Sequence, residues 1–292
     1  MRIVVTGGSG YLGSGVVPAL RARGHEVLTI GRHPQSDAAV CDLTDEAAVR
    51  DAVRAVGDVD SVVHLAARAH HFRGLTRADL LRANTVTTRH LIAALRAEGR
   101  TQAVRFVHAS SASVYELLAG NRAVTPDRAP YAASKLEAEK LLHAEPLCSL
   151  RVLRFAPIYD GDHMEDVARR VFVPGTRLKL RLCPPPMHSL CGKERAIAAI
   201  VAAVETPSSG AFELTNVADA EPWSQRDLVG WFPGAAIPVP TALVRVAARG
   251  LAVCGGPGLR VSRLIDKFAR ASVCPEAEWR AVLEYGGDGS GG

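Results

Sequence analysis

The first thirteen residues of this chain restrict its fold more than any other segment. Residues 2–5 (RIVV) form an apolar run typical of a buried parallel strand, and residues 6–13 (TGGSGYLG) follow directly. Gly7 permits a tight turn, Gly10 lets the backbone approach a pyrophosphate, and Gly13 lets the next helix pack close to the sheet. The N–H groups at the start of that helix would then face the anion. The pattern predicts a strand, a phosphate-binding turn and a helix, with a purely structural turn as the alternative.

Apolar periodicity continues to alternate between strand and helix through the first half of the chain. Strands are predicted near 2–6, 26–30, 61–65, 103–109 and 150–155, and helices near 11–23, 44–56, 76–98 and 129–144. This alternation predicts an α/β fold, in which helices cover both faces of a doubly wound parallel sheet.

The pattern changes after Pro157. Prolines interrupt the following segment, and the later elements are predicted as a helix over 193–205, a strand over 211–214 and a short helix over 223–231. Interrupted pieces of this kind are typical of a lid or cap. We therefore expect a dinucleotide-binding domain over 1–156, a smaller C-terminal substrate-binding region over 157–285 and a flexible glycine-rich tail over 286–292.

Composition argues against several classes of protein. The formal net charge of +5 is modest and the arginines are dispersed, so we expect no nucleic-acid partner. No apolar run reaches the ~20 residues that cross a bilayer, and the N-terminus lacks signal-peptide features, so we expect a cytoplasmic protein with no membrane partner. The six cysteines show neither C-x-x-C spacing nor metal-like spacing to histidine, which favours free thiols without disulfide or zinc.

A second pattern suggests chemistry. Tyr131 precedes Lys135 by four residues near the start of a predicted helix, so both side chains lie on one helical face. A lysine ammonium close to a phenol favours the phenolate, which suits proton transfer at neutral pH. The pair therefore indicates a proton donor for hydride chemistry. Taken alone, the same spacing also fits two ordinary surface residues.

Together these segments resemble the short-chain dehydrogenase/reductase superfamily, in its extended branch that acts largely on nucleotide sugars. Residues 6–13 resemble the cofactor motif of that family, and residues 108–115 (HASSASVY) resemble its catalytic-serine segment. By this resemblance Ser111 touches the substrate oxygen, and Tyr131 and Lys135 form the catalytic pair. The resemblance implies a Rossmann-like fold and a homodimer formed through the helices near 76–98 and 129–144.

The resemblance also implies where a dinucleotide and its substrate would bind. Asp42 and Leu43 resemble the adenine contact, residues 62–67 (VVHLAA) the strand under the nicotinamide ribose, and residues 154–159 (RFAPIY) the strand that leads to the substrate. Asn84 falls where the family has a structural asparagine. The expected cofactor contacts are Gly7, Gly10, Tyr11, Leu12, Gly13, Arg32, Asp42, Leu43, Leu65, Ala66, Ala67, Tyr131, Lys135, Phe155 and Pro157, and Ser111 and Ser113 are expected to contact the substrate.

The end of the second predicted strand bears on the choice of cofactor. An acidic residue about 20 positions past the glycines would bind the adenosine ribose hydroxyls of NAD. Here residues 26–30 are followed by Gly31, Arg32 and His33, so no carboxylate is available and Arg32 is well placed for a 2′-phosphate. We therefore predict NADP(H) over NAD(H). The alternative is an Arg32 that only stacks over adenine.

One basic stretch stands out in the second half. Residues 177–182 (RLKLRL) alternate basic and apolar side chains as a half-buried strand does, which predicts that Arg177, Lys179 and Arg181 share one face. In a substrate region such a face would grip a diphosphate through charge-assisted hydrogen bonds. An exposed edge strand that uses charge to prevent aggregation is the alternative.

The residue types define the expected reaction. In the reductive direction Tyr131 would donate a proton to a carbonyl oxygen, Ser111 would hydrogen-bond that oxygen, and Lys135 would hold the cofactor ribose. Sugar 4,6-dehydratases of this family carry an Asp-Glu pair after the catalytic hydroxyl, where this chain has Ala112 and Ser113. This difference argues against dehydration.

The sequence thus predicts an NADP(H)-dependent oxidoreductase that reduces a 4-keto nucleotide sugar, or runs the reverse oxidation. An NAD-dependent nucleotide-sugar 4-epimerase is the first alternative. A reductase of a non-sugar carbonyl compound is the second, because Glu116 and Asp160 depart from the family pattern. A non-catalytic dinucleotide-binding sensor is the least favoured, since such proteins typically lose the tyrosine or the lysine.

Overall fold

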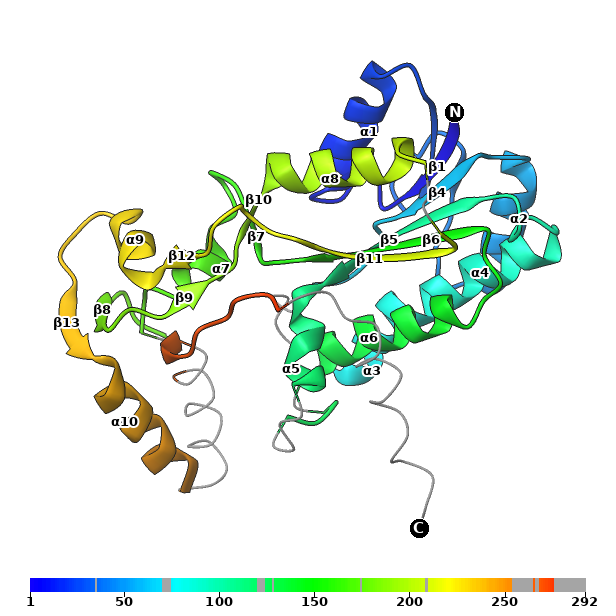
Figure 1. Ribbon diagram of the computed structural model, residues 1–292. Coiled ribbons are helices and arrows are strands. Elements are labelled where there is room, and N and C mark those ends of the chain that lie inside the picture. The colour runs from blue at the N-terminus through cyan, green and yellow to red at the C-terminus, as the bar shows by residue number, and fades with distance from the viewer. Residues whose placement is uncertain are drawn as a thin grey trace, which may run out of the picture. The chain divides into compact units, whose positions relative to one another are not determined.

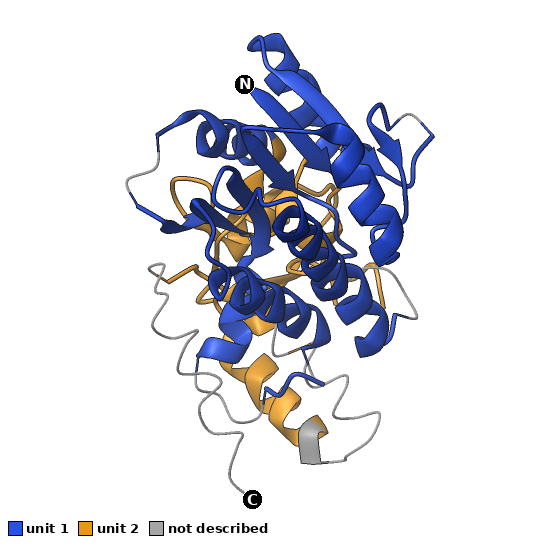
Figure 2. Cartoon of the chain, turned by 90° about the vertical axis from the view of Figure 1, so that its right-hand side faces the viewer, with its two compact units in different colours: residues 1–155, 194–217, 276–292 blue, residues 156–193, 218–275 orange. Residues whose placement is uncertain are grey.

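The chain forms two compact units. Their residue ranges differ from those of the two consecutive domains that the sequence predicts. The structure, a computed structural model, describes residues 1–34, 36–69, 75–119, 124–127, 129–173, 175–207, 210–253, 265 and 268–275. Within this part, unit 1 contains residues 1–155 and 194–217, and unit 2 contains residues 156–193 and 218–275 (Figure 2). The tail expected to be flexible, residues 286–292, lies outside the described residues.

Unit 1 is built on a parallel sheet of seven strands in the order β11-β6-β5-β4-β1-β2-β3 (Figure 1). Every pair of neighbours is parallel, and strands such as β4 are buried along their whole length, as strands covered on both faces must be. This confirms the predicted α/β doubly wound fold. The strands are β1 (Arg2–Thr6), β2 (Glu26–Gly31), β3 (Ala39–Val40), β4 (Ser61–His64), β5 (Arg105–Ser111), β6 (Ser149–Phe155) and β11 (Phe212–Val217).

Helices cover both faces of this sheet (Figure 1). On one face lie α1 (Gly13–Ala22) and α8 (Lys193–Glu205), which are joined where Arg23 pairs with Glu205 at 2.6 Å. On the other lie α2 (Glu46–Val56), α4 (Thr87–Ala97) and α6 (Pro130–His143). The arginines of β6 show the two faces directly. Arg151 donates to the Ala203 carbonyl of α8, whereas Arg154, three residues on, pairs with Glu139 of α6.

The single helix expected over 76–98 is interrupted. It consists of α3 (Arg77–Leu81), a π-helical turn η1 (Arg82–Val86) and α4. Thr76 starts the segment through a capping box with Asp79, in which each side chain bonds the backbone N–H of the other residue. Turns of this type often lie at functional sites, and this one contains Asn84.

Residues 194–217 return to unit 1 and complete its sheet. Strand β11 pairs with β6 in parallel from Phe212–Leu150 to Val217–Phe155, so it is the seventh strand and no part of a lid. The side chain of Arg151 joins the two strands by pairing with Glu213 at 2.9 Å. The expected boundary at residues 156 and 157 therefore lies where the chain first passes from unit 1 to unit 2, but the prediction did not include the return of the chain to unit 1 at residue 194.

Most elements of unit 2 are short, and several of them pack around an aromatic cluster that includes Tyr159, Trp223 and Trp231. The strands of this unit form three two-stranded pairs, β10-β7, β12-β9 and β13-β8. The helix α10, like strand β13, was not predicted from the sequence. The elements are β7 (Ile158–Tyr159), α7 (Glu165–Ala168), β8 (Leu180–Cys183), β9 (Met187–His188), β10 (Cys191–Gly192), β12 (Trp223–Ser224), α9 (Gln225–Gly230), β13 (Ile237–Pro240) and α10 (Thr241–Val253). No helix among the described residues is long and apolar enough to cross a membrane.

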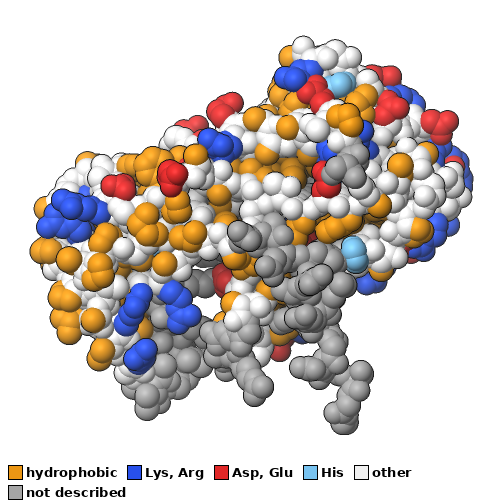
Figure 3. All heavy atoms as spheres, in the orientation of Figure 1, with side chains coloured by type: hydrophobic (Ala, Val, Ile, Leu, Met, Phe, Trp, Pro, Cys, Tyr) orange, Lys and Arg blue, Asp and Glu red, His pale blue; other side chains and the backbone are white. Residues whose placement is uncertain are grey.

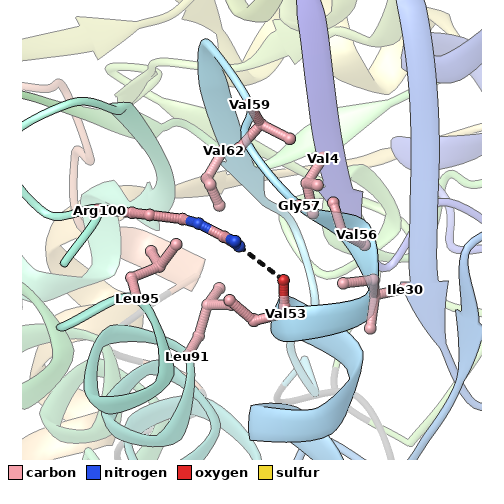
Figure 4. A pocket seen from close by; sticks show the side chains of 10 residues that line it. All are labelled: Val4, Ile30, Val53, Val56, Gly57, Val59, Val62, Leu91, Leu95 and Arg100. Carbon is pink, nitrogen blue, oxygen red and sulfur yellow. Dashed lines mark hydrogen bonds between the residues drawn. The ribbon is translucent and has the colours of Figure 1, made fainter. Parts of the chain in front are cut away.

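A small apolar cavity lies in the core of unit 1 (Figure 4). Its water-accessible volume is about 10 Å³, which accommodates one water molecule at most. Arg100 lies along it and donates from Nη1 to the Val53 carbonyl at 2.7 Å. Gly57 and Val59, which precede β4, also line it, so the cavity lies at the ends of the strands opposite the glycine turn. It is a packing void and no candidate ligand site.

Candidate active site

The glycine turn after β1 packs so closely that side chains are excluded. Gly7 has a φ of 73°, and a Cβ there would lie 2.7 Å from the backbone nitrogen of Ala66. A Cβ on Gly13 would lie 2.2 Å from the Gly7 carbonyl oxygen. The turn is thus pressed against the segment after β4, which contains the predicted contacts Leu65 and Ala66. Ala67 follows them in the same segment.

The start of α1 suits an anion. Its N-cap residue is Leu12, and no side chain caps the helix. The first N–H groups of a helix have no acceptor within the helix, and they carry its positive dipole end. Gly10 leaves this position uncovered because it has no side chain. A Cβ there would meet only the Gly7 carbonyl oxygen, at 3.1 Å, so the space beside Gly10 is otherwise open. The turn therefore fits the pyrophosphate of a dinucleotide.

Polar side chains beneath the turn fix β1 to β4. His64 forms two hydrogen bonds, one between Nδ1 and Thr6 Oγ1 at 2.7 Å and one between Nε2 and Thr88 Oγ1 at 2.9 Å. The Thr88 hydroxyl donates to the Asn84 carbonyl, so it accepts from His64 and fixes the Nε2–H tautomer. Burial lowers the pKa of His64 to about 3, with a smaller contribution from the charge of Lys135. This histidine is therefore neutral at physiological pH and structural.

Arg32 directly follows β2 and is exposed, as the sequence predicts. The nearest following carboxylate, Asp37, does not replace the missing acidic residue. It accepts from the Thr29 N–H at 3.1 Å and also bonds the Thr29 hydroxyl and Arg21. Asp37 therefore serves the fold at the end of β2, which leaves Arg32 as the charged residue at the position where the sequence predicts a contact with the adenosine ribose.

The predicted adenine contacts differ in accessibility. Asp42 is exposed, and the Thr44 N–H donates to its Oδ1 at 2.9 Å. That hydrogen bond lowers the pKa of Asp42, and the nearby charge of Arg32 lowers it further. Leu43 is 5% exposed and belongs to the core, and its carbonyl accepts from His90. Of the two, only Asp42 presents a free side chain surface to a ligand.

Ser111 lies at the end of β5, half-buried, with its hydroxyl oriented by its neighbours. Its Oγ accepts the Ser113 N–H at 3.2 Å and the Ser113 hydroxyl at 3.0 Å, as the N-cap of a short 3₁₀ helix, η2 (Ala112–Val114). Because both bonds use its oxygen as acceptor, the hydrogen of Ser111 is left to donate elsewhere. Ser113 thereby supports Ser111, and its expected contact with the substrate stays a prediction.

Tyr131 and Lys135 lie in the first two turns of α6. Tyr131 is half-buried, whereas Lys135 is 3% exposed and donates from Nζ to the Ala109 carbonyl at 2.9 Å. Ala109 is two residues before Ser111 on β5, so this bond ties the lysine to the strand that carries the serine. Burial lowers the pKa of Lys135 to about 8, and the negative charge of Glu139 opposes that effect.

Asn84 connects the segment after β4 to the first turn of α6. Its Oδ1 accepts the Arg68 N–H at 2.7 Å, and its Nδ2 donates to the Ser134 hydroxyl at 2.9 Å. Ser134 in turn donates to the Tyr131 carbonyl at 2.8 Å. The hydrogen bonds of Asn84 are those of the structural role that the sequence predicts for it. It holds the segment after β4 and the first turn of α6 in a fixed relation.

Sequence reasoning did not single out Glu139 and Arg154. Glu139 is fully buried and receives Arg154 through two bonds, Nε to Oε1 at 3.0 Å and Nη2 to Oε2 at 2.6 Å. The Ser110 hydroxyl also donates to Glu139. Two signals were available. Glu139 continues the spacing of Tyr131 and Lys135 by another four residues, and Arg154 is a charged residue inside a buried strand, which requires a partner.

The expected cationic face of unit 2 is only partly present, and this corrects the sequence analysis. Lys179 is 4% exposed, and its Nζ donates to the Phe232 carbonyl at 2.7 Å. It pairs with Phe172 in an isolated bridge ahead of β8, so the regular alternation breaks there. Arg177 and Arg181 are exposed. Only these two remain available to a ligand.

The exposed surface of β13 and α10 is basic and apolar. Ile237, Leu243 and Val246 are 49%, 61% and 63% exposed, and Arg245 and Arg249 are exposed beside them. Figure 3 shows orange and blue spheres intermixed on this part of unit 2. In unit 1, Phe155 is the last residue of β6 and is 4% exposed. In unit 2, the Pro157 carbonyl accepts the Cys191 N–H at 3.0 Å.

The buried His108 gives a testable consequence for stability. It is 1% exposed, it stacks on His64, and neither ring nitrogen has a hydrogen-bond partner among the described residues. An unsatisfied buried polar group costs about 1–3 kcal/mol. We therefore expect His108→Leu to raise the free energy of unfolding by up to that amount, measured by urea denaturation at pH 7. The exposed His33→Leu is the control and should change it by less than about 0.5 kcal/mol.

The same substitution should alter the pH dependence of stability. Burial lowers the pKa of His108 well below its ordinary value, so on acidification the unfolded chain binds a proton that the folded chain does not. The stability that depends on a neutral His108 is complete above about pH 6.5 and is lost as the pH falls below it. In His108→Leu the decline between pH 6.5 and 4 should be shallower. An unchanged slope would contradict this assignment.

The fold and the site together define a class of protein. A glycine turn shaped for a pyrophosphate lies at the carboxyl ends of a doubly wound sheet, and a serine, a tyrosine and a buried lysine come from the neighbouring β5 and α6. These are the parts of a dinucleotide-dependent oxidoreductase of the short-chain type. Residues 3–156 match the model of the NAD dependent epimerase/dehydratase family, and the chain belongs to that family. It is an enzyme of the short-chain dehydrogenase/reductase superfamily.

Proteins of similar sequence include reductases, hydroxysteroid dehydrogenases, dTDP-glucose 4,6-dehydratases and a UDP-glucose 4-epimerase. The chain is 31% identical over 238 residues to a 3-diazoavenalumate denitrifying reductase from Streptomyces sp, a match that covers 74% of this chain and 76% of the relative. It is 34% identical over 170 residues to a 2-alkyl-3-oxoalkanoate reductase from Stenotrophomonas maltophilia (strain K279a). That match covers 54% of this chain and 50% of the relative, so the chain spans half the length of this protein.

Solved structures confirm the fold. The UDP-Glc/GlcNAc 4-epimerase from Campylobacter jejuni superposes with a TM-score of 0.65 at 18% identity, covering 82% of this chain and 86% of the epimerase. A short-chain dehydrogenase/reductase superfamily protein from Agrobacterium tumefaciens, solved with bound NAD, superposes with a TM-score of 0.63 at 23% identity, covering 98% of this chain and 96% of that one. Identities this low establish a common architecture only.

Proposed function

We propose that this protein is an NADP(H)-dependent carbonyl reductase in which Ser111, Tyr131 and Lys135 form the catalytic group. The observation that carries the proposal is the bond from Lys135 Nζ to the Ala109 carbonyl, two residues before Ser111. It ties the Tyr-Lys helix to the serine strand, so three residues distant in sequence are drawn to one edge of the sheet. That edge is where open α/β sheets bind their ligands.

Each residue has a distinct part in the proposed reaction. Ser111, whose oxygen accepts two bonds from Ser113, directs its own hydrogen to the substrate oxygen. Tyr131 donates the proton that this oxygen gains on reduction. Lys135 stabilises the phenolate that Tyr131 becomes, and it holds the ribose of the dinucleotide. A bound nicotinamide dinucleotide supplies the hydride. Its pyrophosphate would lie on the turn of Gly7, Gly10 and Gly13.

For the substrate we favour a non-sugar carbonyl compound over a nucleotide sugar. The two relatives described above share 31% and 34% identity with this chain, and one is named a reductase of 2-alkyl-3-oxoalkanoates. The burial of Lys179 also removes one of the three cations expected to grip a diphosphate. The 4-keto nucleotide sugar is the second candidate, because Arg177 and Arg181 are exposed and the fold is shared with nucleotide-sugar epimerases.

The proposal is tested by following NADPH oxidation with two substrates, a 2-alkyl-3-oxoacyl compound and a 4-keto-6-deoxy nucleotide sugar. Turnover of the first supports the favoured assignment, and turnover of the second alone supports the other. Mass spectrometry of ligands retained after gentle purification is the complementary measurement. NAD that stays bound, together with interconversion of UDP-hexoses without net redox change, would overturn the reductase in favour of an epimerase.

The cofactor preference gives a separate prediction. Replacing Arg32 by Asp should weaken NADPH binding roughly 10- to 150-fold, because a charge-assisted hydrogen bond worth about 1.5–3 kcal/mol is lost, while NADH binding stays equal or improves. The measurement is titration of cofactor fluorescence. The control is Arg50→Asp, which makes the same charge change at an exposed position of α2. Equal losses in the two variants would mean that Arg32 acts only through net charge.

A further inference from the structure

Tyr131, Lys135 and Glu139 form one stripe along α6. They are four residues apart, so each lies one turn beyond the last on the same face. The two buried members of this stripe, Lys135 and Glu139, contact neighbouring residues of β5. Lys135 bonds the Ala109 carbonyl of β5, and Glu139 accepts from the hydroxyl of the next residue, Ser110. The carboxylate therefore lies one helical turn below the ammonium, against the same strand.

Glu139 rests on a row of polar residues that crosses three strands. Ser110 of β5, Arg154 of β6 and Asn216 of β11 are register partners in the parallel sheet. Arg154 gives Glu139 two bonds and lies over the ring of Tyr115 at 4.9 Å, and the Tyr115 hydroxyl donates to Asn216 at 2.9 Å. The bonds from Arg154 Nε and Nη2 and from the Ser110 hydroxyl fix the position of the carboxylate.

The charges in this interior require an explanation. Lys135, Glu139 and Arg154 are 3%, 0% and 0% exposed, and a buried charge is costly unless an opposite charge lies close to it. The Ala109 carbonyl gives Lys135 only a dipole as partner. Residues one helical turn apart have Cβ atoms about 5–6 Å apart, and the carboxylate of Glu139 acts on Lys135 more strongly than it would in water because water is excluded there.

We propose that Glu139, fixed by Arg154 and Ser110, is a positioning residue that keeps Lys135 protonated beside Tyr131. This proposal rests on the proposed function only for the meaning of Lys135 in catalysis, since the charge of Lys135 is measurable without turnover. The buried position favours a neutral lysine, and the negative charge of Glu139 opposes this. Arg154 has a second effect, because its two bonds to the carboxylate oxygens keep Glu139 from moving to pair with Lys135 directly.

The experiment is an NMR titration of the full-length protein labelled with [¹³Cε]lysine. The chain has five lysines, Lys135, Lys140, Lys179, Lys193 and Lys267, so the spectrum is simple and Lys135→Met assigns the signal. In Glu139→Gln the titration midpoint of Lys135 should fall by roughly one to three pH units, the size of effect expected from a nearby opposite charge. In Arg154→Met it should rise, because the carboxylate is then shared with Lys135 alone.

Two further variants make the result decisive. Ser110→Ala removes a hydrogen bond to Glu139 but no charge, so it should leave the midpoint within about half a unit, which a merely structural role of the network would not predict. Removing one partner of a buried ion pair is strongly destabilising, because it leaves the other charge uncompensated. If a single variant does not fold, Glu139→Gln/Arg154→Met removes both charges, and its midpoint should still lie below that of the wild type.

The outcomes separate this proposal from the proposed function. A midpoint in Glu139→Gln, or in the double variant if the single one does not fold, that equals or exceeds the wild-type value overturns the role of Glu139, whatever the enzyme's substrate. If the midpoints shift as expected and the alkaline limb of kcat/KM shifts with them, both proposals are supported. If the midpoints shift and the alkaline limb does not, the role of Glu139 stands and the catalytic role of Lys135 is refuted.

Discussion

Replacing Tyr131 by Phe is expected to lower kcat about 10²- to 10⁴-fold while dinucleotide affinity changes little. The variant keeps the aromatic ring at the start of α6 and loses the hydroxyl that is proposed to donate the proton. The bonds that place this turn come from Asn84 and Ser134 through backbone and hydroxyl groups, so they are unaffected. The measurements are steady-state NADPH oxidation with the identified substrate and a cofactor-binding titration.

The control for Tyr131→Phe is the same change at Tyr115. The Tyr115 hydroxyl donates to Asn216 at 2.9 Å, so its loss should cost about 1 kcal/mol of stability. Activity should fall by much less than in Tyr131→Phe. If Tyr131→Phe retained activity within tenfold of the wild type, the proton would come from another group, and the catalytic assignment of Tyr131 would be wrong.

Replacing Gly13 by Ala is expected to be the most disruptive change in the glycine turn. Its Cβ would lie 2.2 Å from the Gly7 carbonyl oxygen and 2.7 Å from backbone atoms of Gly8, so backbone would have to move. Overpacking of this kind costs about 3 kcal/mol, and the melting temperature should fall by roughly 5–10 °C. Thermal denaturation measures this, and dinucleotide binding should be lost together with the turn geometry.

Two other glycines distinguish a damaged fold from a blocked site. At Gly10 a Cβ would meet only the Gly7 carbonyl at 3.1 Å, so Gly10→Ala should retain most of the stability and lose dinucleotide affinity. At Gly230, the last residue of α9, a Cβ would meet nothing within 4 Å, so Gly230→Ala should leave both properties unchanged. A stable Gly13→Ala that still binds the dinucleotide would refute the close packing of this turn.

Much of unit 1 follows from local pattern. The strands predicted at 2–6 and 150–155 correspond to β1 and β6 within a residue or two, and the helix predicted over 193–205 corresponds to α8. These elements are specified by neighbouring residues, because apolar side chains must alternate or recur every turn to face a core. Unit 2 is harder, since its strands of two to four residues are too short to show a period.

The candidate site likewise has features that are encoded locally in the sequence and features that are not. The glycine turn and the Tyr131–Lys135 spacing are visible in the sequence because each acts within a single turn of chain. The positions of their supports are not. Whether Asp37 binds a ribose or Thr29, and whether Lys179 faces solvent or Phe232, depends on which backbone groups lie opposite them. Residue type alone does not decide such a choice.

By itself, the sequence determined most of the strands and helices of unit 1, the glycine turn after the first strand and the residues proposed to react, since all of these are encoded over a few consecutive residues. The tertiary structure alone decided that residues 194–217 complete the sheet and that Ser110, Arg154 and Asn216 form one row beneath Glu139. Register between distant strands sets those neighbours, and it results from the packing of the whole core, which no local periodicity contains.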